Sequence, residues 1–229
     1  MNHWSQLTLT RRGGPILLTR TDTLSQAVDD EISRLGNKPI VVLGGPAAVN
    51  DTVARRAARG RSYERLSGRN REATSAAISE YAFPASGTVY VTESLGSDGQ
   101  GSPDAVAGGA LTDGPILLVN GKVGPSEEVQ DEIERLGANN VVQLGGNPLR
   151  TPITGSVIGD DRYETATLIA SRAFGHPGTV YIARGDVFAD AVSAGSLTDG
   201  LVVLTRTNTL PTVTCDWLTA NNPSRVVEQ

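Results

Sequence analysis

Short apolar runs alternate along the chain with segments of helical periodicity. Residues 88–92 form a β-branched and aromatic run, residues 115–119 are continuously apolar, and residues 141–144 are largely apolar, so all three predict buried strands. Residues 71–82 show helical spacing, and residues 103–112 predict a second helix rich in small side chains. The middle of the chain therefore predicts strands and helices in alternation.

An amphipathic helix separates the last two of these strands. It opens near Ser126, and its apolar positions Val129, Ile133 and Leu136 share one face before Gly137 ends it as a C-cap. Strands that alternate with helices of about ten residues imply βαβ crossovers and a parallel sheet. Such a sheet is covered on both faces, which is why its strands are apolar throughout. The predicted fold class is α/β, with small parallel-sheet modules that carry helices on both faces.

Internal repeats run through the whole chain. The segment 115–119 recurs closely at 15–19 and more loosely at 201–205. The flanking segments 104–114 and 190–200 are identical at most of their positions, which chance does not explain. A repeat of this length indicates one supersecondary unit per copy.

The repeat frame divides the chain into three modules. We expect a partial module at 1–62 that lacks its opening half, a complete module at 63–150, and a partial module at 151–229. The closing turn Gly44-Gly45 of the first copy is repeated as Gly145-Gly146 in the second. The third copy stops where its own double glycine would come next, so we expect it to lack its closing turn.

Composition and charge exclude several classes of protein. The chain has 229 residues, of which 38% are hydrophobic and 20% charged, which is typical of a globular protein. Its net charge of −5 argues against a general nucleic-acid binder, because phosphate neutralisation needs an excess of lysine and arginine. No apolar run reaches the roughly 20 residues that span a bilayer. The start of the chain lacks the basic and apolar regions of a secretory signal.

Few side chains are available for catalysis or metal binding. His3 and His176 are distant from each other and Cys215 is the single cysteine, so we predict no Ser/His/Asp triad, zinc site or internal disulfide. Asp186 and Asp190 leave glycan cleavage by a carboxylate pair as an alternative, although helix capping explains the same residues. We expect no cofactor, because the double glycines lack the surrounding pattern of a nucleotide-binding loop and are better explained as tight turns.

The basic residues are strongly biased toward arginine. Eighteen of the 20 are arginine, the side chain suited to bidentate contact with phosphate or carboxylate. Seven arginines but only two acidic residues lie between Asp51 and Arg71. Two interpretations of this cluster stay open: an anionic ligand, or a solvated helix face.

Several motifs in fixed order give the chain a family resemblance. Residues 159–166 look like an opening motif, followed by the strand 180–183, the aspartate loop 185–191, the Pro-Ile-Leu-Leu stretch at 115–118 and the double-glycine turn of the middle copy. On these motifs the chain resembles the cell wall-binding repeat type 2 family of Gram-positive surface proteins. The middle copy departs from the opening motif, since Glu72 stands where the third copy has a tyrosine, and the third copy lacks the proline before residues 201–204.

The resemblance implies a non-catalytic anchor. It implies tandem Toprim-like or Rossmann-like α/β modules that hold a surface protein noncovalently to an anionic cell-wall glycopolymer, with three modules packed around a pseudo-threefold axis within or between chains. The implied location is the cell wall, which would require an export signal upstream of this sequence. A polymer-binding module with repeated weak sites acting by avidity is the first hypothesis. The alternative is a structural self-assembly module without direct polymer binding.

Candidate ligand-binding residues follow from the resemblance and from the loop positions. The loops 20–24 and 206–210 are predicted at the carboxyl ends of strands, where ligands of open α/β folds bind. The strand at 116–118 is predicted to be buried, so its effect on binding can be indirect, through the loop 119–125. The candidates are Arg71, Arg162, Arg20, Arg206, Asp104, Asp190, Pro115, Ile116, Leu117 and Leu118.

Overall fold

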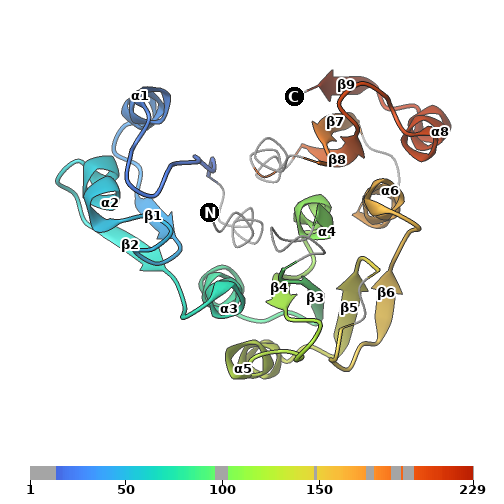
Figure 1. Cartoon of the computed structure of the whole chain (residues 1–229), viewed down its shortest axis with the longest axis horizontal. Coiled ribbons are helices and arrows are strands. Elements are labelled where there is room, and N and C mark those ends of the chain that lie inside the picture. Colours follow the sequence, from blue (N-terminus) through green and yellow to red (C-terminus); the bar gives the residue numbers. More distant parts are fainter. Residues whose placement is uncertain are drawn as a thin grey trace.

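Three separate parallel sheets are arranged around the centre of the molecule in the computed structural model of the chain (Figure 1). The structure describes residues 14–95, 103–146, 149–173, 178–186, 192 and 199–228. The first part of the chain forms α1 (Gln26–Leu35), β1 (Ile40–Leu43), α2 (Asp51–Ala58) and β2 (Tyr63–Leu66). The middle part forms α3 (Arg71–Ala82), β3 (Thr88–Glu93), α4 (Pro103–Ala107), a 3-10 turn (Gly108–Ala110), β4 (Ile116–Val119), α5 (Glu127–Leu136), β5 (Asn140–Leu144) and β6 (Gly155–Val157). The last part forms α6 (Arg162–Ala173), β7 (Thr179–Arg184), β8 (Gly200–Thr205), α8 (Thr212–Asn221) and β9 (Arg225–Glu228).

The middle sheet has the strand order β4-β3-β5-β6, and every neighbouring pair is parallel. Its centre is β3, where Tyr90 lies in register with Ile116 on one side and Val142 on the other. One face packs on α3 and α5 through residues such as Phe83 and Val129. The opposite face packs on α4 and α6. The predicted α/β class with helices on both faces of a parallel sheet is confirmed.

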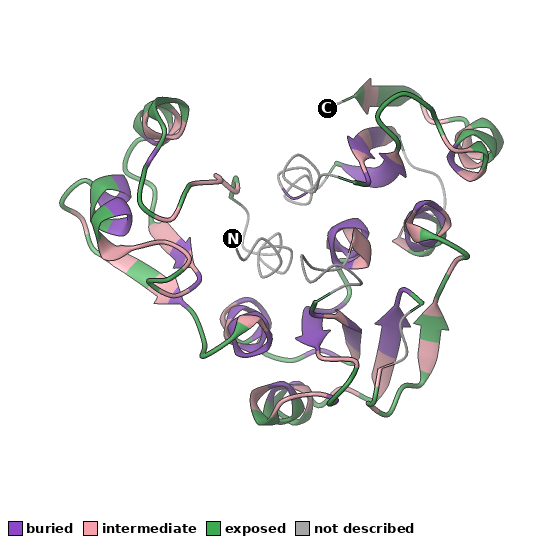
Figure 2. Cartoon of the chain, in the orientation of Figure 1, coloured by how far each residue is buried: buried purple, intermediate pink, exposed green. Residues whose placement is uncertain are grey.

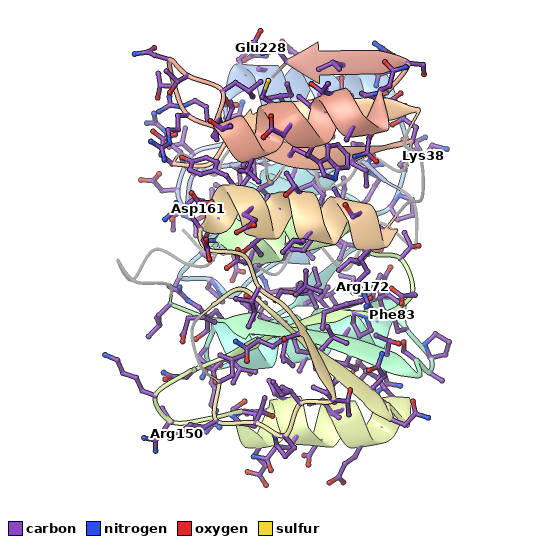
Figure 3. All side chains as sticks on the ribbon, turned by 90° about the vertical axis from the view of Figure 1, so that its right-hand side faces the viewer. Lys38, Phe83, Arg150, Asp161, Arg172 and Glu228 are labelled. Atoms are coloured by element: carbon purple, nitrogen blue, oxygen red, sulfur yellow. The ribbon has the colours of Figure 1, made fainter. Side chains whose placement is uncertain are left out.

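Helix α6 joins the middle and last sheets into one core. A single cluster of buried residues contains Tyr90 and Leu144 of the middle sheet, Ile169 of α6, and Tyr181 and Leu204 of the last sheet. Arg172, near the end of α6, donates from Nε to the Tyr90 hydroxyl at 2.9 Å. Figure 3 shows Asp161 and Arg172 at opposite ends of this helix. The two sheets are therefore packed against each other through apolar and polar contacts.

The sheets are offset by one strand from the sequence repeat. Strand β2, at 63–66, opens the second repeat, yet it pairs with β1 of the first. Strand β6, at 155–157, opens the third repeat, yet it pairs with β5 of the second. In each case the first strand of one repeat pairs with the last strand of the repeat before it, and so completes the sheet of that earlier repeat.

The small-residue helix expected at 103–112 is shorter than its prediction. It ends at Ala107 and continues only as the 3-10 turn Gly108–Ala110. Gly108 lies so close to Ile116 and Leu144 that an added Cβ would come within 2.8 Å of both side chains. Glycine is a poor helix former, and here its lack of a side chain allows the close approach to the sheet.

The first sheet differs from the other two. It contains only β1 and β2 among the residues that the structure describes. The segment 15–19, whose counterpart at 115–119 contains β4, is not part of a strand. Residues 16–18 are half-buried, whereas Ile116, Leu117 and Leu118 are at most 4% exposed. Figure 2 shows the contrast between the largely buried middle sheet and this more exposed first part.

Candidate functional site

The start of α6 lies beside the carboxyl ends of β7 and β8. Asp161 caps the helix, because its Oδ1 accepts the backbone N–H groups of Tyr163 and Glu164, both at 2.9 Å. The Glu164 carboxylate in turn accepts the N–H of Asp160 at 2.6 Å. This reciprocal capping fixes where the helix begins and hence where the next residue, Arg162, is placed.

Three arginines from three different elements meet at this edge of the last sheet. Arg162 of α6 donates from Nη1 to the carbonyl of Gly185, just after β7, at 2.7 Å. Arg184, the last residue of β7, makes a two-pronged ion pair with Asp186 at 3.1 and 2.8 Å. Arg206, the first residue after β8, lies over the ring of Tyr163, with its guanidinium carbon 5.2 Å from the ring centre. We call Arg162, Arg184 and Arg206 the arginine edge.

Among the described residues, the carboxylate of Asp186 pairs with the arginine edge through Arg184. Asp186 is half exposed and also accepts the Thr207 hydroxyl at 3.4 Å. The pKa of Asp186 is lowered, chiefly by the hydrogen bond from Arg184. This carboxylate therefore stays ionised at neutral pH and acts as a counter-ion that orders Arg184. The predicted partner Asp190 lies outside the described residues.

The corresponding edge of the middle sheet has the same scaffold but a different charge. Arg71 of α3 donates from Nη1 to the carbonyl of Ser94 at 2.7 Å, as Arg162 does to Gly185. Here, however, Glu72 replaces Tyr163, and its carboxylate accepts the Ser94 hydroxyl at 3.1 Å. The pKa of Glu72 is raised, mainly by its burial.

A second carboxylate, Glu93, lies at the end of β3. It accepts the N–H groups of Gly121 and Leu95 at 2.9 and 3.1 Å. Its counterpart in β7 is the arginine Arg184. The edge of the middle sheet is thus more acidic than the arginine edge, which makes it the weaker candidate for an anionic ligand.

Arg20 and Arg206 occupy equivalent loops. The sequence Thr-Arg-Thr-Asx-Thr-Leu occurs at both 19–24 and 205–210. In the first loop the Thr19 hydroxyl donates to the carbonyls of Arg20 and Thr23, at 3.3 and 3.0 Å. The Thr205 hydroxyl donates in the same pattern four residues across its own loop. The two loops therefore share one turn, and each presents an exposed arginine.

Asp104 links the aspartate loop to the double-glycine turn. It lies in the first turn of α4, and its carboxylate packs against Gly145, so that a side chain at Gly145 would overlap it. Gly145 also has a φ of +84°, which favours glycine. The double glycine is explained by this contact and by the turn geometry, which agrees with the tight-turn interpretation.

The candidates Pro115, Ile116, Leu117 and Leu118 lie in the interior. Ile116 and Leu118 belong to the core cluster on one face of the sheet, and Leu117 to the cluster on the other. All four are buried. These side chains do not present a surface to a ligand in this structure. Their packing anchors β4 in the core, and β4 leads into the loop that begins at Asn120.

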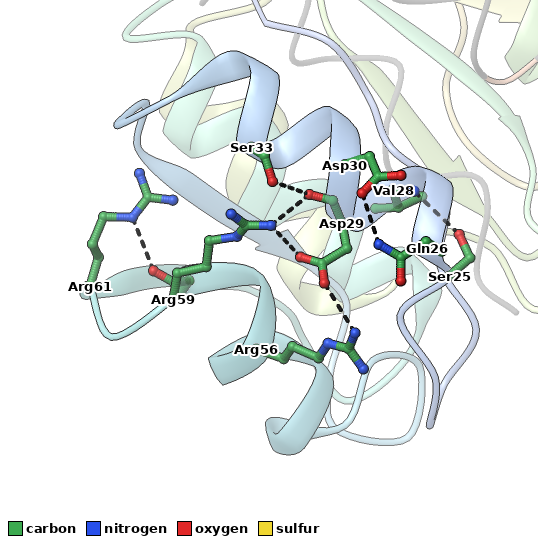
Figure 4. Close-up of polar contacts among 10 residues, drawn as sticks. Ser25, Gln26, Val28, Asp29, Asp30, Ser33, Arg56, Arg59 and Arg61 are labelled. Atoms are coloured by element: carbon green, nitrogen blue, oxygen red, sulfur yellow. Dashed lines mark hydrogen bonds and ion pairs between the residues drawn. The ribbon is translucent and has the colours of Figure 1, made fainter.

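The arginine-rich run between Asp51 and Arg71 is engaged in contacts within the protein. Arg56 and Arg59 both pair with Asp29 of α1, which ties α2 to α1 (Figure 4). Arg65 pairs with Asp51 at 3.0 Å. The pKa of Asp29 is lowered, chiefly by the hydrogen bond from Arg59. Much of the local positive charge is therefore neutralised within the fold.

The described part of the chain offers neither a metal site nor a membrane span. No group of three or more His, Cys, Asp or Glu side chains is placed there to hold a metal ion. Within the same residues no helix is both long and apolar enough to cross a membrane.

Sequence reasoning missed two polar features. Arg184 was not among the candidates, although it aligns with Glu93 and so marks a charge reversal between the repeats. The contact of Tyr90 with Asp113, at 2.9 Å, was missed as well. It recurs as Tyr181 with Asp199 at 2.9 Å, so the repeated tyrosine and aspartate could have revealed it.

Tandem parallel sheets with polar loops at their carboxyl ends define the chain as an α/β repeat module. The family model Cell wall binding domain 2 (CWB2) matches residues 65–149 and 157–227, more than half of the chain. The chain belongs to this family and is a cell wall-binding module. The family resemblance seen in the sequence is confirmed.

The chain is also similar to individual proteins. The N-acetylmuramoyl-L-alanine amidase LytC of Bacillus subtilis is 26% identical over 197 residues, which cover 82% of this chain and 38% of LytC. Cwp6 and Cwp8 from Clostridium difficile have TM-scores of 0.85 and 0.80 at 18% and 20% identity, and show the same fold. The matches cover 99% of this chain, but only 39% of Cwp6 and 42% of Cwp8. This chain therefore spans about two fifths of the length of these three proteins.

Proposed function

We propose that the module binds an anionic cell-wall glycopolymer at the arginine edge. The observation that carries this proposal is the meeting of Arg162, Arg184 and Arg206, from three elements, at the carboxyl-end edge of the last sheet. Guanidinium groups match the geometry of phosphate and carboxylate oxygens. The carboxyl ends of the strands are also the usual ligand position in open α/β sheets.

Each arginine has a distinct part in this proposal. Arg206 is exposed and stacked on Tyr163, so it is the first contact for a polymer anion. Arg184 is held by Asp186 and can share its guanidinium with a second anion. Arg162 is half-buried and bound to the Gly185 carbonyl, so it contributes charge and shapes the loop. Arg20, in the equivalent loop of the first module, gives a second weak site, and two such sites raise retention by avidity.

The other candidate residues take supporting parts. Arg71 holds the loop of the middle sheet through the Ser94 carbonyl, and Asp104 holds the double-glycine turn. The buried stretch 115–118 acts on binding only through the loop that follows it. The module itself acts without catalysis, at the cell surface, as a noncovalent anchor for a longer protein.

The test is a sedimentation assay of the chain on isolated cell walls, with and without chemical removal of the anionic polymers. Arg206→Ala should weaken binding by about 1 kcal/mol, a roughly fivefold higher Kd. Arg225→Ala is the matched control, because Arg225 is also exposed but lies at the amino end of β9, at the opposite edge of the same sheet. Equal losses for the two variants, or binding that is insensitive to salt and to polymer removal, would refute the site.

The proposal also includes packing of the modules against one another within one chain. The core that α6 shares with the middle and last sheets favours association of modules within one chain. We expect a monomer by light scattering at the concentrations that bind walls. A concentration-dependent trimer without wall affinity would favour the self-assembly alternative. Release of reducing sugar from walls, lost in Asp186→Asn, would instead favour glycan cleavage.

A further inference from the structure

The carboxyl-end edges of the middle and last sheets share individual backbone contacts. At the start of α3 the Thr74 hydroxyl accepts the N–H of Gly68 at 3.0 Å. At the start of α6 the Thr165 hydroxyl accepts the N–H of Gly159 at 3.1 Å. The first arginine of each helix also donates to the backbone carbonyl just after the neighbouring strand, at 2.7 Å in both cases. At these positions the two edges therefore differ in their side chains and not in their backbone contacts.

One pair of positions differs between the edges in a coordinated way. Along the repeat, Glu72 corresponds to Tyr163, and Ser94 corresponds to Gly185. A Cβ added at Gly185 would lie 2.8 Å from Cε1 of Tyr163, so a serine there would clash with the tyrosine ring. In the middle sheet the Ser94 hydroxyl instead donates to the Glu72 carboxylate at 3.1 Å. The tyrosine therefore requires the glycine, whereas the glutamate is matched by the serine.

Tyr163 provides a fixed support for Arg206. Its side chain belongs to the core that α6 shares with the middle and last sheets, and the residue is only 8% exposed. The guanidinium carbon of Arg206 lies 5.2 Å from the centre of this ring. A cation held over a ring face loses less conformational freedom on binding an anion than an unsupported arginine does. The ring therefore prepares the exposed arginine for an anionic ligand.

The middle edge lacks both parts of this arrangement. Asn120 stands where the last edge has Arg206. The Oδ1 atom of Asn120 accepts the N–H groups of Lys122 and Val123, at 3.0 and 3.3 Å, so this side chain is turned into its own loop. Glu72 offers a carboxylate at the position of the aromatic ring. The same scaffold thus carries a supported cation in one sheet and a carboxylate in the other.

We propose that Tyr163, accommodated by Gly185, is the positioning residue that makes the arginine edge an anion site, and that Glu72 with Ser94 closes the equivalent middle edge to anions. The inference rests on the proposed function and names the residues that select between the two edges. Tyr163 acts through Arg206 and does not bind the anion itself. An anion should therefore bind at one of these two edges only.

Inorganic phosphate, titrated into the full chain labelled with nitrogen-15, compares the two edges in one protein. The Nε–Hε signals of Arg206 and Arg71 report on the last and middle edges. The ring current of Tyr163 should shift the Arg206 signal upfield before phosphate is added. At constant ionic strength we expect phosphate to move the Arg206 signal in a saturable way. The signals of Arg71 and of Arg225, at the opposite edge of the last sheet, should stay unchanged.

Substitutions at Tyr163 separate the ring from its bulk. Tyr163→Leu keeps an apolar side chain in the core but removes the ring. It should abolish the upfield shift of Arg206 and raise the Kd for phosphate about two- to fivefold, the range expected for loss of a cation–ring contact near the surface. Tyr163→Phe retains the ring, so it should restore both the shift and the affinity.

A paired substitution copies the middle edge into the last one. Tyr163→Glu combined with Gly185→Ser reproduces the side chains of Glu72 and Ser94, which already occur on the same scaffold. This variant should raise the Kd for phosphate at least about fivefold, because it removes the ring and also places a carboxylate near Arg206. Circular dichroism and the amide spectrum of each variant establish that it is folded before affinities are compared.

Several results would overturn the inference. These are equal phosphate-dependent shifts of Arg71 and Arg206 in the parent, or a folded Tyr163→Leu variant with the Kd of the parent. The comparison within the parent decides the question even where a variant does not fold. Loss of phosphate binding in Arg206→Ala but not in Tyr163→Leu would keep the proposed function and reject the part given to Tyr163. A parent that binds neither phosphate nor walls would refute the proposed function itself.

Discussion

Truncation of one leucine at each of two equivalent repeat positions, Leu117 and Leu17, tests how the repeated Pro-Ile-Leu-Leu stretch acts. Leu117 in β4 is 0% exposed and packs with Val89, Val119 and Val129. Leu117→Ala should cost about 2–5 kcal/mol, because it removes buried methyl groups and leaves a cavity in a packed core. Leu17 is half-buried and already borders a cavity. Leu17→Ala should therefore cost only about 1 kcal/mol.

Urea unfolding followed by circular dichroism measures both losses. Wall sedimentation of each variant should be carried out at urea-free conditions under which the variant is fully folded. We expect Leu117→Ala to bind walls as the parent does once folding is controlled, since Leu117 reaches no surface. A folded, stable Leu117→Ala that no longer binds walls would contradict this reasoning and make the leucine a direct contact. Equal costs for the two variants would contradict the looser packing of the first module.

Three further changes probe separate features. Gly145→Ala should lower the free energy of unfolding by about 2–3 kcal/mol, because Gly145 has a φ of +84° and an added side chain would overlap Asp104. Gly137→Ala, at φ +68° in open space, should lower it by only about 1 kcal/mol, and thermal unfolding compares the two variants. The pKa of Asp29 is lowered by arginine hydrogen bonds, so its stabilising effect is full above the ordinary value of 3.8 and is lost as pH falls through the lowered value. The stability gap between the parent and Asp29→Asn should therefore shrink in acid unfolding titrations below about pH 4, and a gap that widens there would contradict this sign. Arg172→Ala should cost about 1 kcal/mol in urea, through loss of its hydrogen bond and ring contact, and no cost would show that this contact between modules is dispensable.

Local pattern predicted most elements of the middle module, but it missed β2 and made the helix at 103–112 too long. The helix predicted at 71–82 coincides with α3, and the strand predicted at 88–92 is one residue shorter than β3. The segment 15–19 does not form a strand, although its sequence is nearly that of 115–119, where a strand was predicted and β4 is found. A strand needs a partner, and the partner of this segment is a property of the whole sheet, which local sequence does not encode.

The site was harder to predict than the fold. The repeat predicted that Arg71 and Arg162 occupy equivalent positions. The structure places them at the first residues of α3 and α6, respectively. The sequence could not show that both guanidinium groups bond to backbone carbonyls, because this depends on how the loops after β3 and β7 turn. The charge reversal between Glu93 and Arg184 was visible in the aligned repeats, but only the sheet edge shows that it changes the ligand surface.

The one-strand offset between repeats and sheets has a consequence for how such arrays change by recombination. Because β2 pairs with β1 and β6 pairs with β5, neighbouring repeats are joined by backbone hydrogen bonds and not only by side chains. A crossover at a repeat boundary exchanges the closing strand of one sheet for that of another repeat, which can pair in the same way. Loss of a terminal repeat instead uncovers a strand edge on its neighbour. Gain or loss of internal repeats should therefore be tolerated better than loss at the ends.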